Sequence, residues 1–318
     1  MVLRRRGTLG QWIGAAVLVS MAACSTDRDP DELFAPGGAG VPVVDAVLVV
    51  GQAFPDVYLT RTLAPDEPFS LERAAISGAT VTIRGDTTTI VYVDGGAPGQ
   101  YSAPVTGDTI LPATRYDLTV DLPGGGTLRA TTTTPAWIRV REWVLLDDTG
   151  STVLQQLSTF AETGDSVYYQ PENQLVYPQG LVEIRLDAAP AQGYQVGLSS
   201  LDLASPLLID ADFLDEEDLD DFTRANSSPP FAVTTTAIRI PWLAIYFEGT
   251  YKMRVFAMDR NWFDLALTDP VLGGAGIGFG GEAGDSFNRP IFHVEGGIGL
   301  FGSMSVDSVG FYVHPPAP

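Results

Sequence analysis

Cysteine, histidine and lysine are scarce in this chain. Its 318 residues include one Cys, two His and a single lysine, Lys252. One cysteine excludes an internal disulfide framework and the cysteine-rich zinc sites, and two histidines leave little for a histidine-based metal centre. We therefore expect no metal site and no cofactor held by these side chains.

Basic residues are also few, with Lys+Arg 18 against Asp+Glu 39 and a formal net charge of −21. Nucleic acids are bound mainly by clustered lysine and arginine facing the phosphates. A chain this acidic is not expected to bind nucleic acid. Anionic lipid headgroups would repel it as well, so electrostatic adsorption to a membrane is not expected either.

Turn-forming residues are abundant, with 34 Gly and 23 Pro. Residues 79–84 alternate apolar and polar side chains, as in a strand with one buried face. Residues 116–122 and 127–134 do the same on either side of the turn Pro123–Gly126. The pattern predicts an all-β protein with two β-sandwich domains in tandem, over residues 43–135 and 136–318. The one helix that we expect is short and lies near residues 212–224.

The N-terminus is typical of a bacterial lipoprotein leader. Arg4, Arg5 and Arg6 precede an uncharged segment, residues 7–23, that is too short to span a bilayer comfortably. This segment ends Ser-Met-Ala-Ala before Cys24, which resembles the lipobox at which lipoproteins are cut and acylated. We expect a signal peptide over residues 1–23, palmitate-type acyl chains on Cys24 and a flexible stalk over residues 24–42. The alternative is an ordinary signal peptide followed by a chance cysteine.

An acidic insertion is expected over residues 202–230. Eight carboxylates fall within twelve residues there, and their order does not match an EF-hand loop. A solvated surface segment is the simplest interpretation, and a weak Ca²⁺ site stays open. As candidate contacts with a ligand or partner we take Asp210, Asp212, Asp215, Glu216, Glu217 and Asp218.

Two glycine-rich stretches have different interpretations. Residues 273–288 contain a formal G-x-G-x-x-G but no helix follows it, so we expect a surface loop rather than a nucleotide site. Gly296, Gly297, Gly299 and Gly302 form the second stretch, GGxGxFG, where we expect a strand crossover with close backbone approach.

No residue is a convincing catalytic candidate. No G-x-S-x-G motif is present. His293 and Glu295 would share a strand face, so we interpret His293 as a hydrogen-bonded structural residue. Lys252 is expected to face solvent beside Arg254. We do not expect an enzyme.

Two sets of segments carry a family resemblance. Residues 76–83, 99–101 and 116–120 look like a carboxypeptidase-regulatory-like or immunoglobulin-like sandwich. Residues 251–262 and the GGxGxFG stretch, together with the lipobox, resemble the uncharacterised outer-membrane lipoproteins of domain-of-unknown-function family 4249. The resemblance implies an envelope lipoprotein associated with TonB-dependent outer-membrane transporters, and no activity.

We therefore expect a non-enzymatic lipoprotein, anchored in the outer membrane through its N-terminal lipid, that binds a partner protein or ligand. A polysaccharide hydrolase using paired carboxylates and a passive spacer or adhesin are the alternatives.

Overall fold

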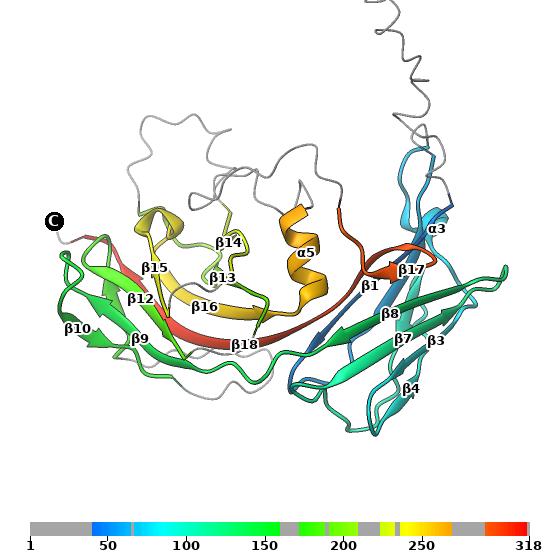
Figure 1. Ribbon diagram of the computed structural model, residues 1–318. Helices are drawn as coiled ribbons and strands as arrows, with labels where there is room; N and C mark the ends of the chain where they lie inside the picture. The colour runs from blue at the N-terminus through cyan, green and yellow to red at the C-terminus, as the bar shows by residue number, and fades with distance from the viewer. Residues whose placement is uncertain are drawn as a thin grey trace, which may run out of the picture.

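The computed structural model describes residues 40–64, 67–159, 172–187, 191–208, 223–232, 236–268 and 290–316. These residues form three sheets and few helices, so the prediction of an all-β, sandwich-like fold is confirmed (Figure 1). All but the last two residues of the helix predicted near residues 212–224 lie outside the described residues.

The longest sheet runs through the whole described body. Its C-terminal strand β18 spans 17 residues and pairs with β16 on one side and β1 on the other. In order, the sheet contains β14 (Ala225–Ser227), β13 (Gly193–Ser200), β16 (Gly249–Met258), β18 (Ile298–His314), β1 (Pro42–Val49), β2 (Val57–Arg61), β6 (Gln100–Ser102) and β5 (Val93–Asp94), with β11 (Gln174–Val176) also on β18.

Two smaller sheets cover different parts of the long one, as Figure 1 shows. The four-stranded sheet contains β10 (Val153–Gln156), β9 (Val140–Leu146), β12 (Leu181–Leu186) and β15 (Ala237–Ile240). The five-stranded sheet contains β17 (Val294–Glu295), β8 (Thr127–Thr133), β7 (Arg115–Asp121), β3 (Thr80–Arg84) and β4 (Thr89–Val91).

Each small sheet closes a hydrophobic core against the long sheet. Val81 and Ile83 of β3 are fully buried while Thr80 and Arg84 are exposed, as the alternation predicted. β18 contributes to both cores, with Phe301 in the N-terminal one and Phe311 in the C-terminal one. The domain boundary expected at Pro135 stays a prediction. The two cores share β18, which follows that boundary in sequence and still completes the first core.

The glycines at the start of β18 allow the crossover between the cores. Gly299 has φ +111°, and a Cβ there would overlap the carbonyl oxygen of Val44 in β1. A Cβ at Gly297 would likewise lie only 2.5 Å from the carbonyl oxygen of Pro42. The expected close backbone approach is therefore confirmed, and it permits the parallel pairing of β1 with β18.

Two expectations are wrong. Lys252 is 5% exposed rather than solvent-facing, although its neighbour Arg254 on the same face of β16 is half-buried. The longest described helix, α5 (Arg260–Thr268), was also not expected; it follows β16 directly. The other helices in the described part of the chain are α3 (Leu71–Ala74) and the 3₁₀ turn η2 (Trp242–Ala244). Within the described ranges, no helix has the length and apolar character needed to cross a bilayer.

Candidate functional site

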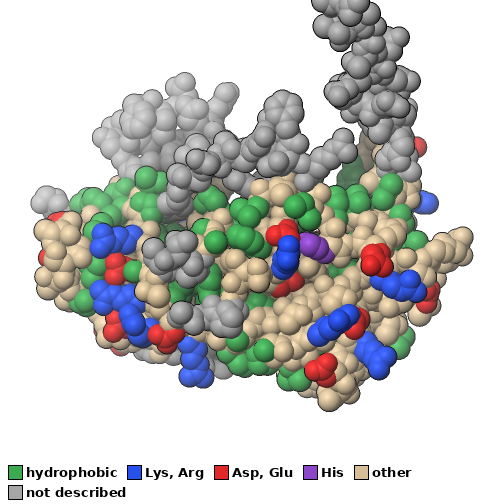
Figure 2. All heavy atoms as spheres, viewed as in Figure 1, with side chains coloured by type: hydrophobic (Ala, Val, Ile, Leu, Met, Phe, Trp, Pro, Cys, Tyr) green, Lys and Arg blue, Asp and Glu red, His purple; other side chains and the backbone are tan. Residues whose placement is uncertain are grey.

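A polar groove of about 600 Å³ lies between the outer face of the five-stranded sheet and residues 292–295, which His293 links to α5. Figure 2 shows charged side chains of both signs gathered over β7 and β8 on this face. The groove is lined on its polar side by Arg115, Asp117, Arg129, Thr131, Asn261, His293 and Glu295.

The sheet side of the groove is an ordered network. Alternation in β7 sends Arg115 and Asp117 outward, while Tyr116 and Leu118 enter the core. Asp117 Oδ1 lies 2.8 Å from Arg115 Nη2 and accepts a 2.6 Å hydrogen bond from the Thr131 hydroxyl. Burial alone would raise the pKa of Asp117, but the hydrogen bonds from Arg115 and Thr131 outweigh it and lower the pKa. The carboxylate therefore stays ionised.

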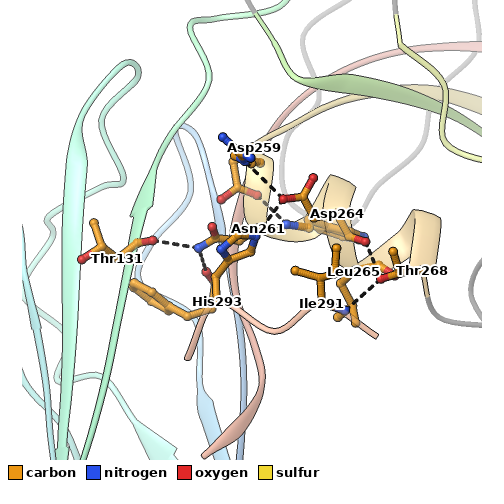
Figure 3. Close-up of polar contacts among 11 residues, drawn as sticks. Thr131, Asp259, Asn261, Asp264, Leu265, Thr268, Ile291 and His293 are labelled. Carbon is orange, nitrogen blue, oxygen red and sulfur yellow. Dashed lines mark hydrogen bonds and ion pairs between the residues drawn. The ribbon is translucent and has the colours of Figure 1, made fainter. Parts of the chain in front are cut away.

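The opposite wall carries a histidine–aspartate pair. His293 Nε2 lies 2.8 Å from Asp264 Oδ2 on α5, and the same oxygen is 3.2 Å from Arg260 Nε (Figure 3). His293 is therefore hydrogen-bonded, as expected, but its partner is on α5 and was not foreseen. The contact fixes the loop before β17 against the helix.

Asn261 joins α5 to both sheets. Its Nδ2 donates to the carbonyl oxygen of Thr131 at 2.7 Å and to that of Phe301 at 2.8 Å. In Figure 3 its side chain bridges the helix and the strand carrying Thr131. The Asn261 side chain thus links β8, β18 and α5 at the floor of the groove.

Asp259 begins the helix and is buried behind this floor. Its Oδ1 accepts the backbone N–H of Trp262 at 3.0 Å, and its Oδ2 accepts the Thr132 hydroxyl at 2.5 Å. Burial raises its pKa, and these hydrogen bonds offset only part of the effect. The sequence signal for α5 was present, since Asp259 stands at an N-cap position before an apolar pattern that includes Leu265 and Ala266.

The groove is suited to binding a polar ligand. Arg129 and Glu295 occupy directly opposite positions in the β17–β8 pair. A positive and a negative side chain therefore lie side by side at the edge of the groove. The hydroxyl of Thr131 donates to Asp117 rather than to His293, so these groups do not form a nucleophile–histidine–acid relay. Among the described residues, no three His, Cys, Asp or Glu side chains are grouped closely enough to hold a metal ion.

The structure does not test the site residues predicted from sequence. Cys24 and the acidic residues Asp210, Asp212, Asp215, Glu216, Glu217 and Asp218 lie outside the described residues, as does the loop 273–288.

Arg224, just after the acidic run in sequence, makes several contacts with the described body. Its Nη1 donates to the carbonyl oxygen of Asp202 at 2.7 Å and to the Ser205 hydroxyl at 3.0 Å. Its guanidinium also lies 4.0 Å from the centre of the Phe247 ring. These contacts fix the chain to the body just after the acidic run. A depression of about 620 Å³, lined by residues 201–206, lies at the same place.

Comparison with known families gives one match. The family model described as Domain of unknown function (DUF4249) matches residues 39–264. No curated protein matches the chain.

Proposed function

The chain belongs to the family described as Domain of unknown function (DUF4249), and from this premise we propose a non-enzymatic envelope lipoprotein. Acyl chains on Cys24 hold it at the outer membrane, and its β body binds a partner protein or ligand there. The partner is a TonB-dependent transporter, to which this protein is accessory. The immunoglobulin-like or carboxypeptidase-regulatory-like character of residues 43–135 is part of the same proposal.

The anchor is supported by where the family match begins. The family match starts at residue 39, and the first described residue, Gly40, donates its N–H to the carbonyl oxygen of Thr62 at 2.7 Å. The lipobox-like segment ending at Cys24 therefore precedes the matched body by a short stretch of sequence. This order of leader, spacer and folded body is what a tethered lipoprotein requires.

The groove is the observation that carries the binding role. Its polar lining comes from β7, β8, β17 and α5, and hydrogen bonds through Asn261 and His293 fix these elements to each other. Binding sites on such rigid elements lose little entropy when a ligand arrives.

The groove favours binding over paired-carboxylate hydrolysis. A hydrolase of that kind needs one carboxyl with a raised pKa next to an ionised one. Asp117, which lines the groove, has a lowered pKa, while Asp259, whose pKa is raised, is enclosed by Thr132 and the start of α5.

Affinity capture from solubilised outer membranes tests the proposal. We expect the tagged wild-type chain to recover a TonB-dependent transporter. The Arg129→Glu variant should recover several-fold less, whereas Asp108→Arg, an exposed change outside the groove, should behave like wild type. Equal recovery by all three variants would remove the groove from the proposal, and the absence of any transporter would favour the passive spacer.

A further inference from the structure

One tip of the N-terminal sandwich lies where the described chain begins, at Gly40. The backbone N–H groups of Gly40 and Val41 donate to the carbonyl and hydroxyl oxygens of Thr62, and the Thr62 N–H donates back to Val41. The chain that arrives from Cys24 is thus bonded to the loop after β2. Figure 1 shows α3 in this region, beside the start of β1.

Two large apolar side chains project from this tip. Phe69 is 76% exposed and Leu71 is 42% exposed. Isolated exposed apolar residues are ordinary on protein surfaces. Here two of them lie within three residues of each other, next to the segment that leads to the expected lipid.

The tip is braced and does not depend on its apolar residues for its shape. Arg61 Nε and Nη2 both donate to the carbonyl oxygen of Arg73 at 3.3 Å, and Arg73 in turn donates to the carbonyl oxygen of Pro68. The N–H of Ala75 donates to Leu71. Phe69 is therefore presented on a loop whose ends are fixed.

The charges around the tip nearly cancel, unlike those of the whole chain. Arg61 and Arg73 stand beside Glu67 and Glu72, and Asp66 adds one more acidic residue to this stretch of sequence, so its formal charge is −1 against −21 for the chain. Hydrogen bonds from the backbone and from Ser70 lower the pKa of Glu72, so it is charged at neutral pH. A tip with so little net charge and two apolar side chains meets little electrostatic repulsion at a lipid surface.

We propose that this tip, residues 67–73, contacts the bilayer and that Phe69 and Leu71 enter its interfacial region. The inference rests on the proposed anchor at Cys24. The 15 residues from Ser25 to Ala39 span at most about 50 Å when fully extended, which keeps the tip within reach of the membrane. Two apolar side chains would not hold a free protein on a bilayer. The acyl chains on Cys24 already hold this protein at the membrane, so the contact of Phe69 and Leu71 becomes effectively intramolecular and therefore favourable.

The opposite end of the same sandwich provides a matched control. β2 runs toward the tether, with Arg61 opposite Pro42, and β6 runs antiparallel to β2, so the chain after Ser102 leads away from the tether. Val105 follows there and is fully exposed. It is apolar like Phe69, but it faces away from the proposed membrane contact.

Site-specific labelling tests the contact on the full mature lipoprotein in phosphatidylethanolamine–phosphatidylglycerol vesicles. Because the chain has one cysteine, acylation of Cys24 leaves an introduced thiol as the only site for a polarity-sensitive fluorophore. The variants are Phe69→Cys, Leu71→Cys and Val105→Cys. We expect nitroxide-labelled lipids to quench the fluorophore at positions 69 and 71 at least threefold more than at position 105.

Equal quenching at the three positions, or none, would overturn the proposal. So would protection of position 69 in native outer membranes but not in lipid vesicles, since a protein would then be the occupant. Unmodified wild-type protein serves as the control for the anchor. If it takes up the fluorophore, Cys24 is not acylated, and the proposed anchor fails together with the inference. If it takes up none and position 69 is not quenched, only the inference fails.

Discussion

The hydroxyl of Thr132 donates a 2.5 Å hydrogen bond to Oδ2 of Asp259, a residue 127 positions later in the chain. Thr132 also lies 2.7 Å from the hydroxyl of Ser303. These three buried side chains join β8, the start of α5 and β18. The floor of the groove is therefore fixed by polar contacts between distant segments.

Replacing Asp259 removes the cap of α5 and the partner of Thr132 together. We expect Asp259→Ala to lower the free energy of unfolding by about 2–4 kcal/mol, because a helix cap and a buried hydrogen bond are both lost. Asp108→Ala, at an exposed position, should change it by less than about 0.5 kcal/mol. Urea titration measures both values. An Asp259→Ala chain as stable as the Asp108 control would show that the junction is not a stabilising contact.

The raised pKa of Asp259 makes stability depend on pH in a defined direction. A carboxyl with a raised folded-state pKa contributes stability that is complete below the ordinary value of 3.8. This stability is lost as the pH rises through the raised value. Asp259→Asn is uncharged throughout, so its stability relative to wild type should increase between pH 4 and pH 8. A difference between the two chains that stays constant over this range would contradict the buried carboxyl.

The crossover at Gly299 tolerates no side chain. Its φ of +111° and its contact with the carbonyl oxygen of Val44 mean that Gly299→Ala must displace β1 from β18. We expect a loss of more than about 3 kcal/mol, measured by chemical denaturation. Gly124→Ala is the matched control, since nothing lies within 4 Å of a Cβ there. Similar effects at the two glycines would argue against the close pairing.

The two cores are expected to unfold together because β18 belongs to both. Phe301 is fully buried in the N-terminal core, so Phe301→Ala should cost about 3–5 kcal/mol. Hydrogen exchange should then accelerate at Val81 in the N-terminal core and also at Leu186 in the C-terminal core. Acceleration confined to Val81 would show that the halves are energetically independent.

Alternating sequence patterns predicted the strands well where one face of a strand is covered. Residues 79–84 and 127–134 were expected to alternate as strands, and they are observed as β3 (Thr80–Arg84) and β8 (Thr127–Thr133). Alternation describes β16 correctly at Tyr251, Met253 and Val255, which are buried, but it did not predict that Lys252 on the other face is covered as well. The parallel pairing of Val43 with Ile298 was not predictable, since it joins residues from opposite ends of the chain and leaves no local periodicity.

The groove was only partly predictable. His293 stood out because the chain has two histidines, but its partner Asp264 lies on a helix that was not expected. Asn261 acts through backbone carbonyl groups, and such acceptors carry no sequence signal. The residues chosen instead, Asp210–Asp218, were selected by charge density alone.

The most direct test of the account is the mass of the N-terminal peptide of the protein extracted from outer membranes after growth with labelled palmitate. We predict a chain that begins at Cys24 and carries acyl groups on that residue, with label in wild type and in Ser25→Ala but none in Cys24→Ala. A membrane-bound chain that begins at another residue, or whose Cys24 is unmodified, would contradict the anchored lipoprotein.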